Sequence, residues 1–561
     1  MNTYKKIFYL FVILAFITGC KKENFVKQNT NPDILTGIDP EKEFLNATVQ
    51  IHQQDFEAYY DYYRRIMPWM QMNTDQAGNS KTFITSVGNF NSRYGIFYPT
   101  LGAQIADLHY LIDQKPDAEK AAYVYVGNIA DILKIYYAFY VSDINGSLPY
   151  RQAFQGRYGG TVTPVYETQP QLFAILDSSL KAITTTLATT QSTEQVSLGS
   201  NDLYFGGNVT KWIKVANALR LRIAMRVSKK DEATAKAIFA DVLLNTTQME
   251  SNDDSWAFYA TPASGIATTG TNWDVTTLRA PRPTVNFMIK NGDPRIRDYY
   301  EKNNYTQANL NIAIDSGLYK PGTVASAQQY VGAPISPDST QGATAKYRNW
   351  FIPKTVNGTL VLDTISYLKR RLWTPDYNSG TGNVTMPVLT YADYCFMRAE
   401  LVAKGYTTTG GTAEEWYNKG VEASVRFYDG AAMKAKVEDY TAVTAAEIAT
   451  YLNAADVKFD ASKALEQIAI QSYINFYKQP NEAWAVYKRT GMPNSSTALA
   501  NEDIVIDGSV KAIPRRASLS LPASNDPNYA NKEAAIQQMA TDPGFGNGPS
   551  DLFGRVWWDS Q

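Results

Sequence analysis

Residues 481–493 read NEAWAVYKRTGMP and place two aromatic side chains, Trp484 and Tyr487, shortly before the basic residue Arg489. The aromatic rings carry large apolar faces, which suit a junction where C-terminal segments of the chain pack on helices. The guanidinium of Arg489 can satisfy a helix end or a carboxylate through forked hydrogen bonds. We therefore interpret this stretch as part of the scaffold rather than as a binding site.

Three further blocks follow in the C-terminal third of the chain. They read IPRR at residues 513–516, NKEAA at residues 531–535 and VWWD at residues 556–559. The arginines and tryptophans in these blocks also fit packing against helices better than ligand contact. We assign the same scaffold role to Arg515, Arg516, Trp557 and Trp558.

Helical patterns dominate both ends of the chain, and the predicted fold class is mainly α. Apolar residues recur at three- and four-residue steps over residues 120–141 and again over residues 212–227, which predicts two helices. Residues 391–404 and 412–427 predict two antiparallel helices joined by a short loop, and another helix is expected from residue 462 to about residue 477. Such hairpins resemble degenerate tetratricopeptide units, although no clean period of about 34 residues is present.

Basic residues accompany the apolar ones on the helix predicted over residues 212–227. A basic set of this kind is usually either a solvated face or paired with carboxylates, and the sequence leaves both readings open. The residues concerned are Lys214, Arg220, Arg222 and Arg226.

Residues from about 253 to 387 have a different character. Gly, Pro, Thr and Asn are frequent there and aromatic residues stand alone, as in TGTNW at residues 269–273 and DYNSG at residues 376–380. The segment is far too long for structureless filler in a compact chain, so we predict a loop-rich region with few short strands. Because binding residues are often found on loops held by a rigid frame, this region is the expected ligand-facing part.

Several aromatic residues in loops have polar neighbours that could share a ligand. An aromatic ring flanked by Asn, Asp or Arg is a suitable platform for a sugar ring, and the same rings also hold peptide side chains. Composition does not separate these two ligand classes, and each ring taken singly is more often structural. The predicted ligand-binding residues are Trp69, Asn73, Asp75, Trp273, Asp274, Trp350, Trp373 and Tyr377.

The N-terminus has the pattern of a lipoprotein signal. Lys5 and Lys6 precede an apolar run over residues 7–17, which is too short to span a bilayer core of about 30 Å. The run ends in ITGC, which resembles a bacterial lipobox in which Cys20 is acylated and becomes the first residue of the mature chain. We expect residues 1–19 to be a signal peptide and residues 20–36 an extended, lipidated tether.

Composition and motifs argue against several classes of function. Lys and Arg number 53 against 54 Asp and Glu, so no basic field for nucleic acid is present, and no later segment is apolar enough to cross a membrane. The two histidines, His52 and His109, form no metal-binding pattern. The chain also lacks a nucleophile elbow and a phosphate-binding glycine loop. We expect no enzyme activity, no catalytic residues, no metal and no cofactor.

The block at residues 481–493 resembles the E-x-W-x-x-x-R-R-T-G-x-P stretch of the SusD/RagB family of outer-membrane nutrient-binding lipoproteins. The three later blocks follow in the order of that family, and a further match extends back to NTNP at residues 29–32, so the resemblance covers nearly the whole chain. It implies a SusD-like fold in a single domain over residues 37–561. The parts of that domain are helical hairpins at about 40–250 and 389–480, the loop-rich ligand-facing region at about 253–387, and the family blocks at 481–561.

The resemblance also implies a location and a mechanism. A SusD-like protein lies as a lid over a SusC-like TonB-dependent transporter, and ligand is trapped between lid and barrel before import. We therefore expect a protein lipid-anchored in the outer membrane, facing the cell exterior, that captures an oligosaccharide or an oligopeptide. Two alternatives stay open. One is a lipid-anchored surface glycoside hydrolase, because carboxylates are plentiful, and the other is a structural subunit of a surface complex.

Overall fold

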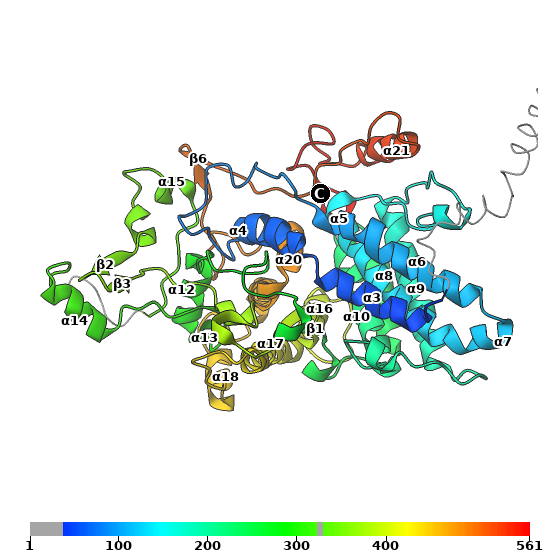
Figure 1. Cartoon of the computed structure of the whole chain (residues 1–561), viewed down its shortest axis with the longest axis horizontal. Helices are drawn as coiled ribbons and strands as arrows, with labels where there is room; N and C mark the ends of the chain where they lie inside the picture. The colour runs from blue at the N-terminus through cyan, green and yellow to red at the C-terminus, as the bar shows by residue number, and fades with distance from the viewer. Residues whose placement is uncertain (1–36, 322–328, 561) are drawn as a thin grey trace, which may run out of the picture.

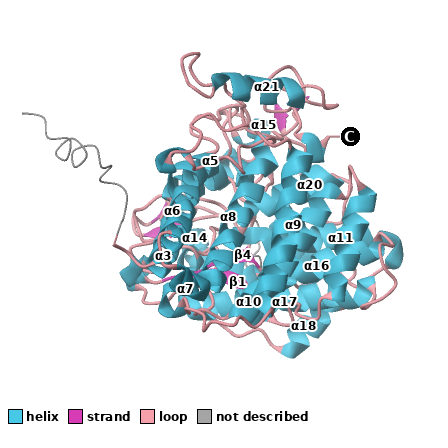
Figure 2. Ribbon diagram, turned by 90° about the vertical axis from the view of Figure 1, so that its right-hand side faces the viewer, coloured by secondary structure: helices cyan, strands magenta, loops and turns pink. Residues whose placement is uncertain are grey.

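The structure, a computed structural model, describes residues 37–321 and 329–560. The predicted signal peptide, the tether and Cys20 lie outside the described residues. Among the helices that are described, none is both long and apolar enough to cross a membrane. The described chain is mostly helical, with short strands and many connecting loops (Figures 1 and 2).

The N-terminal half forms a group of packed helices that surrounds one hydrophobic core. Helix α10 contacts α8, α9 and α11, and α3 packs on α6. Figure 1 shows these helices together on the right-hand side. Their bounds are α3 Pro40–His52, α6 Gly102–Asp113, α7 Asp117–Lys120, α8 Val124–Asn145, α9 Gln169–Ala188, α10 Val209–Val227 and α11 Glu232–Leu244.

A second group of helices from the C-terminal half forms another core. Helices α16 and α17 make the predicted antiparallel hairpin, and α16 also contacts α10 and so joins the two groups. The bounds are α16 Tyr391–Ala403, α17 Ala413–Ala435, α18 Ala445–Leu452, α19 Ala464–Asn475 and α20 Pro480–Thr490.

The structure confirms the predicted start of α17 but not its predicted end. The capping box at Thr412 is present, because the Thr412 hydroxyl accepts from Glu415 N–H and the Glu415 carboxylate accepts from Thr412 N–H. The helix continues past Phe427 to Ala435 and ends where Lys436 adopts a left-handed conformation. Small alanines in the last two turns are buried against the core, which favours the longer helix.

Short strands join the two ends of the loop-rich region. Strand β1 (Trp256–Ala260) pairs antiparallel with β4 (Val384–Leu389), so the two ends of the region lie side by side. Two hairpins complete the described strands, β2 (Lys354–Val356) with β3 (Leu360–Leu362) and β5 (Val505–Ile506) with β6 (Ser509–Val510). The prediction of a mainly α protein with few short strands is confirmed.

The remaining helices are short and lie near the loops. Two of them, η1 Glu57–Ile66 and η2 Phe97–Leu101, have π-helical hydrogen bonding, which is rare in proteins. Figure 1 shows α21, in red, lying beyond the helical groups on the same side as α5. The bounds of the others are α4 Met67–Trp69, α5 Ser92–Ile96, α12 Arg282–Asn291, α13 Ile296–Tyr299, α14 Gln307–Asp315, α15 Pro337–Thr340 and α21 Tyr529–Met539.

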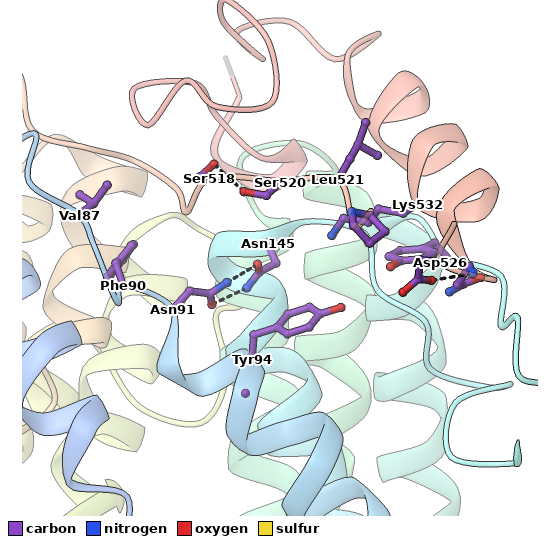
Figure 3. Close-up of a pocket in the computed structure, with 14 residues that line it drawn as sticks. Val87, Phe90, Asn91, Tyr94, Asn145, Ser518, Ser520, Leu521, Asp526 and Lys532 are labelled. Carbon is purple, nitrogen blue, oxygen red and sulfur yellow. Dashed lines mark hydrogen bonds between the residues drawn. The ribbon is translucent and has the colours of Figure 1, made fainter. Parts of the chain in front are cut away.

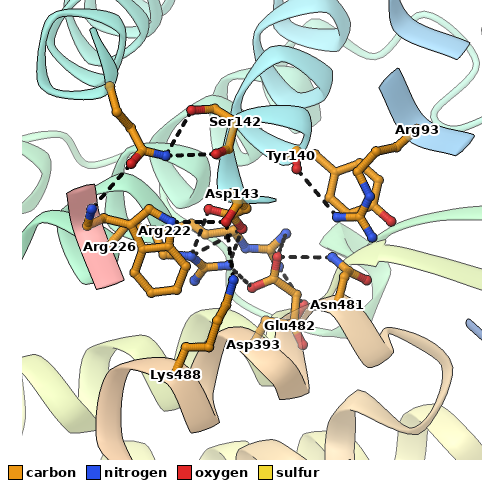
Figure 4. A network of polar contacts seen from close by, with 12 residues as sticks. Arg93, Tyr140, Ser142, Asp143, Arg222, Arg226, Asp393, Asn481, Glu482 and Lys488 are labelled. Atoms are coloured by element: carbon orange, nitrogen blue, oxygen red, sulfur yellow. Dashed lines mark hydrogen bonds and ion pairs between the residues drawn. The ribbon is translucent and has the colours of Figure 1, made fainter. Parts of the chain in front are cut away.

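The basic residues of α10 are paired with carboxylates. Arg226 binds Asp143 of α8 at 2.9 Å and Glu482 of α20 at 2.8 Å, and Arg222 binds Asp393 of α16 at 3.0 Å. We call these five buried residues the charge network, and Figure 4 shows them converging from four helices. The network therefore ties α10 to both helical groups.

The C-terminal sequence blocks supply side chains that are buried or paired with other parts of the chain. Trp484 and Trp558 are fully buried, and the Trp484 indole Nε1 donates to the Pro514 carbonyl at 3.0 Å. Arg489 pairs with Glu400, and Arg515 pairs with Asp559 near the end of the chain. These contacts agree with the reading of the blocks as packing elements.

Candidate functional site

Two of the predicted ligand-binding residues lie in the core. Trp69 is 1% exposed, and its Nε1 donates to the Phe83 carbonyl at 3.1 Å. Asn73 is fully buried, and its amide donates to the Tyr63 carbonyl at 3.3 Å. Both side chains are therefore enclosed by the protein, and contact of Trp69 or Asn73 with ligand stays a prediction. Neither offers a face to a ligand in this conformation.

Asp75 lies at the surface and is held by the π-helix η1. Its carboxylate accepts from Arg64 at 2.7 Å, and the same guanidinium lies 4.9 Å from the centroid of the Tyr59 ring. The Asp75 side chain is 44% exposed and can therefore still meet a ligand. Contact with ligand at Asp75 stays a prediction.

The structure brings together four predicted residues that are far apart in the sequence. Asp274 accepts from Arg370 Nε at 2.7 Å, and the Arg370 guanidinium lies 4.1 Å from the centroid of the Tyr377 ring. Trp273 and Trp373 line one cavity of about 80 Å³. The side chains of Asp274 and Trp373 are buried, whereas Trp273 and Tyr377 are partly exposed.

The cavity between Trp273 and Trp373 is too small for an oligomeric ligand. Water occupies about 30 Å³ per molecule in the liquid, so the cavity has room for two or three waters. Its walls include His52, whose pKa is lowered to about 3 by burial, and Lys478, whose pKa is lowered to about 7 by burial. Trp373 therefore lines a small cavity, and its contact with an oligomeric ligand stays a prediction.

Figure 1 shows α14, α15, β2 and β3 together on the left-hand side, and we call this part of the structure the outer lobe. Trp350 belongs to it, because it lies between α15 and β2 in the chain. Its ring meets Tyr347 edge-on at 4.9 Å and packs on a small core that contains Phe351. The ring is partly exposed. Contact of ligand with Trp350, Trp273 or Tyr377 stays a prediction.

A much larger pocket opens between α5 and the C-terminal segment that leads into α21. Its volume is about 640 Å³, within the range of about 300–1,000 Å³ typical of ligand sites. Figure 3 shows residues from α5, α8 and the C-terminal segment around it, and we call it the α5 pocket. Its lining residues are Val87, Phe90, Asn91, Tyr94, Gly95, Asn145, Tyr166, Ser518, Ser520, Leu521, Pro522, Asp526, Asn528 and Lys532.

One wall of the α5 pocket is fixed by Asp61 of η1. The backbone N–H groups of Asn91 and Ser92 donate to its carboxylate at 3.0 and 2.9 Å, and Asn91 adopts a left-handed conformation with φ 90°. Burial raises the pKa of Asp61 to about 7, although Arg93 and the two N–H donors act in the opposite direction. The side chain of Asn91 is thereby turned toward the pocket.

Amide groups form a second feature of that wall. Asn91 and Asn145 exchange two hydrogen bonds through their side chains, at 2.8 and 3.0 Å, as Figure 3 shows. Asn145 is the last residue of α8, and Gly146, which follows it, has a φ of 71°. The pair presents amide donors and acceptors at fixed positions.

Tyrosine rings and one lysine also line the α5 pocket. The ring of Tyr94 contacts that of Tyr98 in a tilted arrangement, with a centroid separation of 4.6 Å and an interplanar angle of 46°. The ammonium nitrogen of Lys532 lies 5.6 Å from the centroid of Tyr94 and 5.4 Å from that of Tyr166. Burial lowers the pKa of the Lys532 amine. Aromatic faces, amides and a cation thus share one concave surface.

The groups in the α5 pocket suit binding better than catalysis. Hydrolysis of a glycosidic bond generally needs two carboxyl groups across the scissile bond, about 5–9.5 Å apart. Among the residues that line the pocket, Asp526 carries the single carboxylate. Within residues 37–321 and 329–560, no group of three His, Cys, Asp or Glu could hold a metal ion.

The residues of the α5 pocket escaped prediction because none lies in the loop-rich region. Tyr94 follows a left-handed turn, Tyr166 lies between α8 and α9, and Lys532 comes from a block interpreted as scaffold. Only the folding of the C-terminal segment back beside α5 assembles them. The Asn145-Gly146 sequence is typical of a helix end, and a helix end does not by itself indicate a binding site.

The sequence matches, over residues 32–518, the model of a protein family that is described as SusD-like and as starch-binding, associating with the outer membrane. No curated protein matches the chain.

Several solved structures resemble the chain along most of its length. A chitin-binding protein superposes with a TM-score of 0.68 at 22% identity, over 93% of this chain and 100% of its own. A SusD homologue from Bacteroides fragilis gives 0.65 at 21% identity, over 92% and 100%. A chitin-binding SusD homologue from Flavobacterium johnsoniae gives 0.63 at 18% identity, over 93% and 99%. At these identities the likeness shows a shared fold.

Proposed function

Because the chain belongs to the SusD-like family of starch-binding proteins that associate with the outer membrane, we propose that it captures an oligomeric nutrient at the cell surface. The observation that carries the proposal is the α5 pocket, whose volume of about 640 Å³ is lined by tyrosine rings and amides. Such a surface can stack on a ring and hydrogen-bond to its substituents without chemistry.

An oligosaccharide fits these groups better than a peptide. Tyr94 and Tyr166 offer faces for a pyranose ring, and the Asn91–Asn145 pair offers donors and acceptors to hydroxyl groups. Two proteins of the same fold are described as chitin-binding, which supports a glycan. Binding of a peptide in place of a glycan is an outcome that the screen below can return.

The proposal also includes a lipid anchor for the protein and delivery of the captured ligand to a transporter. The lipobox-like sequence that ends at Cys20 supports a lipid anchor in the outer membrane, with the protein facing the exterior. The family resemblance supports a role as a lid that delivers ligand to a SusC-like TonB-dependent transporter. The alternative of a glycoside hydrolase is less favoured, because Asp526 is the single carboxylate among the residues lining the α5 pocket.

The Tyr94→Ala variant tests the pocket. A soluble form that begins after Cys20 is screened against oligosaccharide and peptide libraries, and the best ligand is titrated by calorimetry. We expect Tyr94→Ala to weaken binding about tenfold, equivalent to about 1.4 kcal/mol, because a stacking face is removed.

Tyr110 provides a matched control for that variant. It is also partly exposed and stacks on Tyr158 with a centroid separation of 4.4 Å, but it does not line the α5 pocket. Tyr110→Ala should bind as the wild type does. Equal affinities for all three proteins, at equal melting temperatures, would place the capture site elsewhere, and Trp273 and Trp350 would then be the next positions to replace.

The Cys20→Ala variant tests the anchor. We expect the full-length variant to fold normally but to leave the membrane fraction, because a single residue carries all the acylation and no described helix can cross a membrane. Fractionation is carried out in a strain that lacks the transporter, so that protein contacts cannot retain it. Continued membrane retention of Cys20→Ala in that strain would rule out the lipid anchor.

A further inference from the structure

Lys532 is a cation without a counter-charge inside the α5 pocket. The side chain leaves the first turn of α21 and, in Figure 3, lies on the side of the pocket opposite α5. Within residues 37–321 and 329–560, its ammonium group has no hydrogen-bond or ion-pair partner, and its near contacts are the ring faces of Tyr94 and Tyr166. Three N–H donors are therefore available.

The surroundings of Lys532 make an unpaired charge costly. The side chain is largely enclosed, and burial lowers the pKa of its amine, which means that the charged form is disfavoured. Contacts with the two aromatic faces offset part of this cost but supply no acceptor for the N–H groups. Lys369, by comparison, is buried and binds Glu301 at 2.9 Å and Asp439 at 2.7 Å.

The carboxylates near Lys532 do not neutralise it. Asp526 lies on the exposed rim of the pocket, where one of its oxygens accepts from the Asn528 N–H at 2.8 Å. Glu533 follows Lys532 in the chain, but it accepts from the Tyr529 hydroxyl at 3.3 Å and does not line the pocket. Neither lies within ion-pair distance of the ammonium, so the interior of the pocket keeps a positive charge.

We propose that the α5 pocket selects acidic oligosaccharides, with a carboxylate or sulfate of the sugar bound to the ammonium group of Lys532. This inference rests on the proposed function and specifies its ligand class. An anion at this position supplies the missing acceptor and forms a charge-assisted hydrogen bond in an enclosed site. The tyrosine faces and the Asn91–Asn145 pair hold the ring that carries the anion.

A matched pair of ligands tests the charge selection. A uronic-acid oligosaccharide and a neutral oligosaccharide of the same length are titrated by calorimetry into the soluble wild type and into Lys532→Met, which keeps side-chain length without charge. We expect the acidic ligand to bind the wild type at least tenfold more tightly than the neutral one. Lys532→Met should lose that tenfold preference and keep its affinity for the neutral ligand, whereas Lys532→Arg should retain the preference.

Lys134 of α8 provides a matched control. Its ammonium also lies over two aromatic rings, at 5.1 Å from Tyr150 and 5.6 Å from Phe154, and it has no ion pair among the described residues. It does not line the α5 pocket. Lys134→Met should therefore leave binding of both ligands unchanged, and the melting temperatures of all variants show that each is folded.

The outcomes separate this inference from the proposed function. Equal binding of acidic and neutral oligosaccharides, unchanged in Lys532→Met, overturns the charge selection and leaves glycan capture standing. Binding of an acidic peptide but of no oligosaccharide overturns both the sugar assignment and this inference. A wild type that binds no member of either library overturns the proposed function itself.

Discussion

Glu482→Gln should lower the free energy of unfolding by about 3–5 kcal/mol, the range expected when one partner of a buried ion pair is removed. The substitution keeps the shape of the side chain and removes its charge. Glu482 is 4% exposed and lies at the start of α20, where its carboxylate faces two guanidinium groups of α10. Arg226 would keep Asp143 and Arg222 would keep Asp393, but each buried guanidinium would lose its second carboxylate.

The effect should be large because the charge network connects both helical groups. Arg226 binds Glu482 at 2.8 Å and Asp143 at 2.9 Å, while Arg222 lies 3.6 Å from Glu482 and 3.0 Å from Asp393. In Figure 4 these side chains converge between α8, α10 and α20. Loss of the central carboxylate therefore weakens the junction of α20 with α10, on which the C-terminal segment depends.

An exposed pair of the same chemistry provides the control. Glu422 and Arg426 are four residues apart on α17 and pair at 2.8 Å, with about half of each side chain exposed. Exposed pairs of this kind contribute about 0.3–0.5 kcal/mol, so Glu422→Gln should be nearly silent. Urea unfolding of the two variants and the wild type measures the difference. Equal losses would show that the charge network contributes no more than a surface pair.

The pH dependence gives a second measurement of the same network. Burial alone would raise the pKa of Glu482, but Arg222 and Arg226 outweigh burial and hold that pKa below its ordinary value of 4.5. The unfolded chain then takes up the proton first on acidification, so the stabilisation by Glu482 is present above pH 4.5 and is lost as the pH falls below it. The gap between wild type and Glu482→Gln should narrow in acid.

The helical frame was predictable because its signals are local. The apolar spacing over residues 212–227 and the capping box at Thr412 are both contained within a few turns, and α10 and α17 formed where these signals lie. The carboxylates that pair with the arginines of α10 were not predictable. Asp393 and Glu482 are 171 and 256 residues away from their partners, Arg222 and Arg226, and only tertiary packing brings them close.

The candidate site was harder to predict, for two physical reasons. A tryptophan in a loop-like sequence is also a large apolar group that gains stability by burial. Trp69 and Trp373 are both buried in the core. The α5 pocket in turn depends on contacts between α5 and the C-terminal segment, to which no local pattern refers. Tyr94 and Lys532 are ordinary surface residues in the sequence, and they become a site only when these two segments meet.

Trp484→Ala should also lower the free energy of unfolding by about 3–5 kcal/mol, because a large aromatic ring is removed from a closely packed core. The ring of Trp484 lies 5.6 Å from that of Trp69 and 6.2 Å from that of Phe90, measured between centroids. Phe90 lines the α5 pocket, so the cavity left by the indole would loosen a wall of the candidate site. Trp484→Ala should therefore weaken ligand binding as well as stability.

Two comparisons separate the loss of packing from the loss of tryptophan as such. Trp484→Phe keeps a ring in the core but removes the hydrogen bond from Nε1 to the Pro514 carbonyl, so its loss should be smaller, at about 1–3 kcal/mol. Trp350→Ala removes a partly exposed ring from the outer lobe and should cost about 1 kcal/mol or less. Urea unfolding ranks the three variants. A loss for Trp350→Ala as large as that for Trp484→Ala would contradict the scaffold role of the block at residues 481–493, because that role requires the core ring at Trp484 to carry more stability than a ring on a loop.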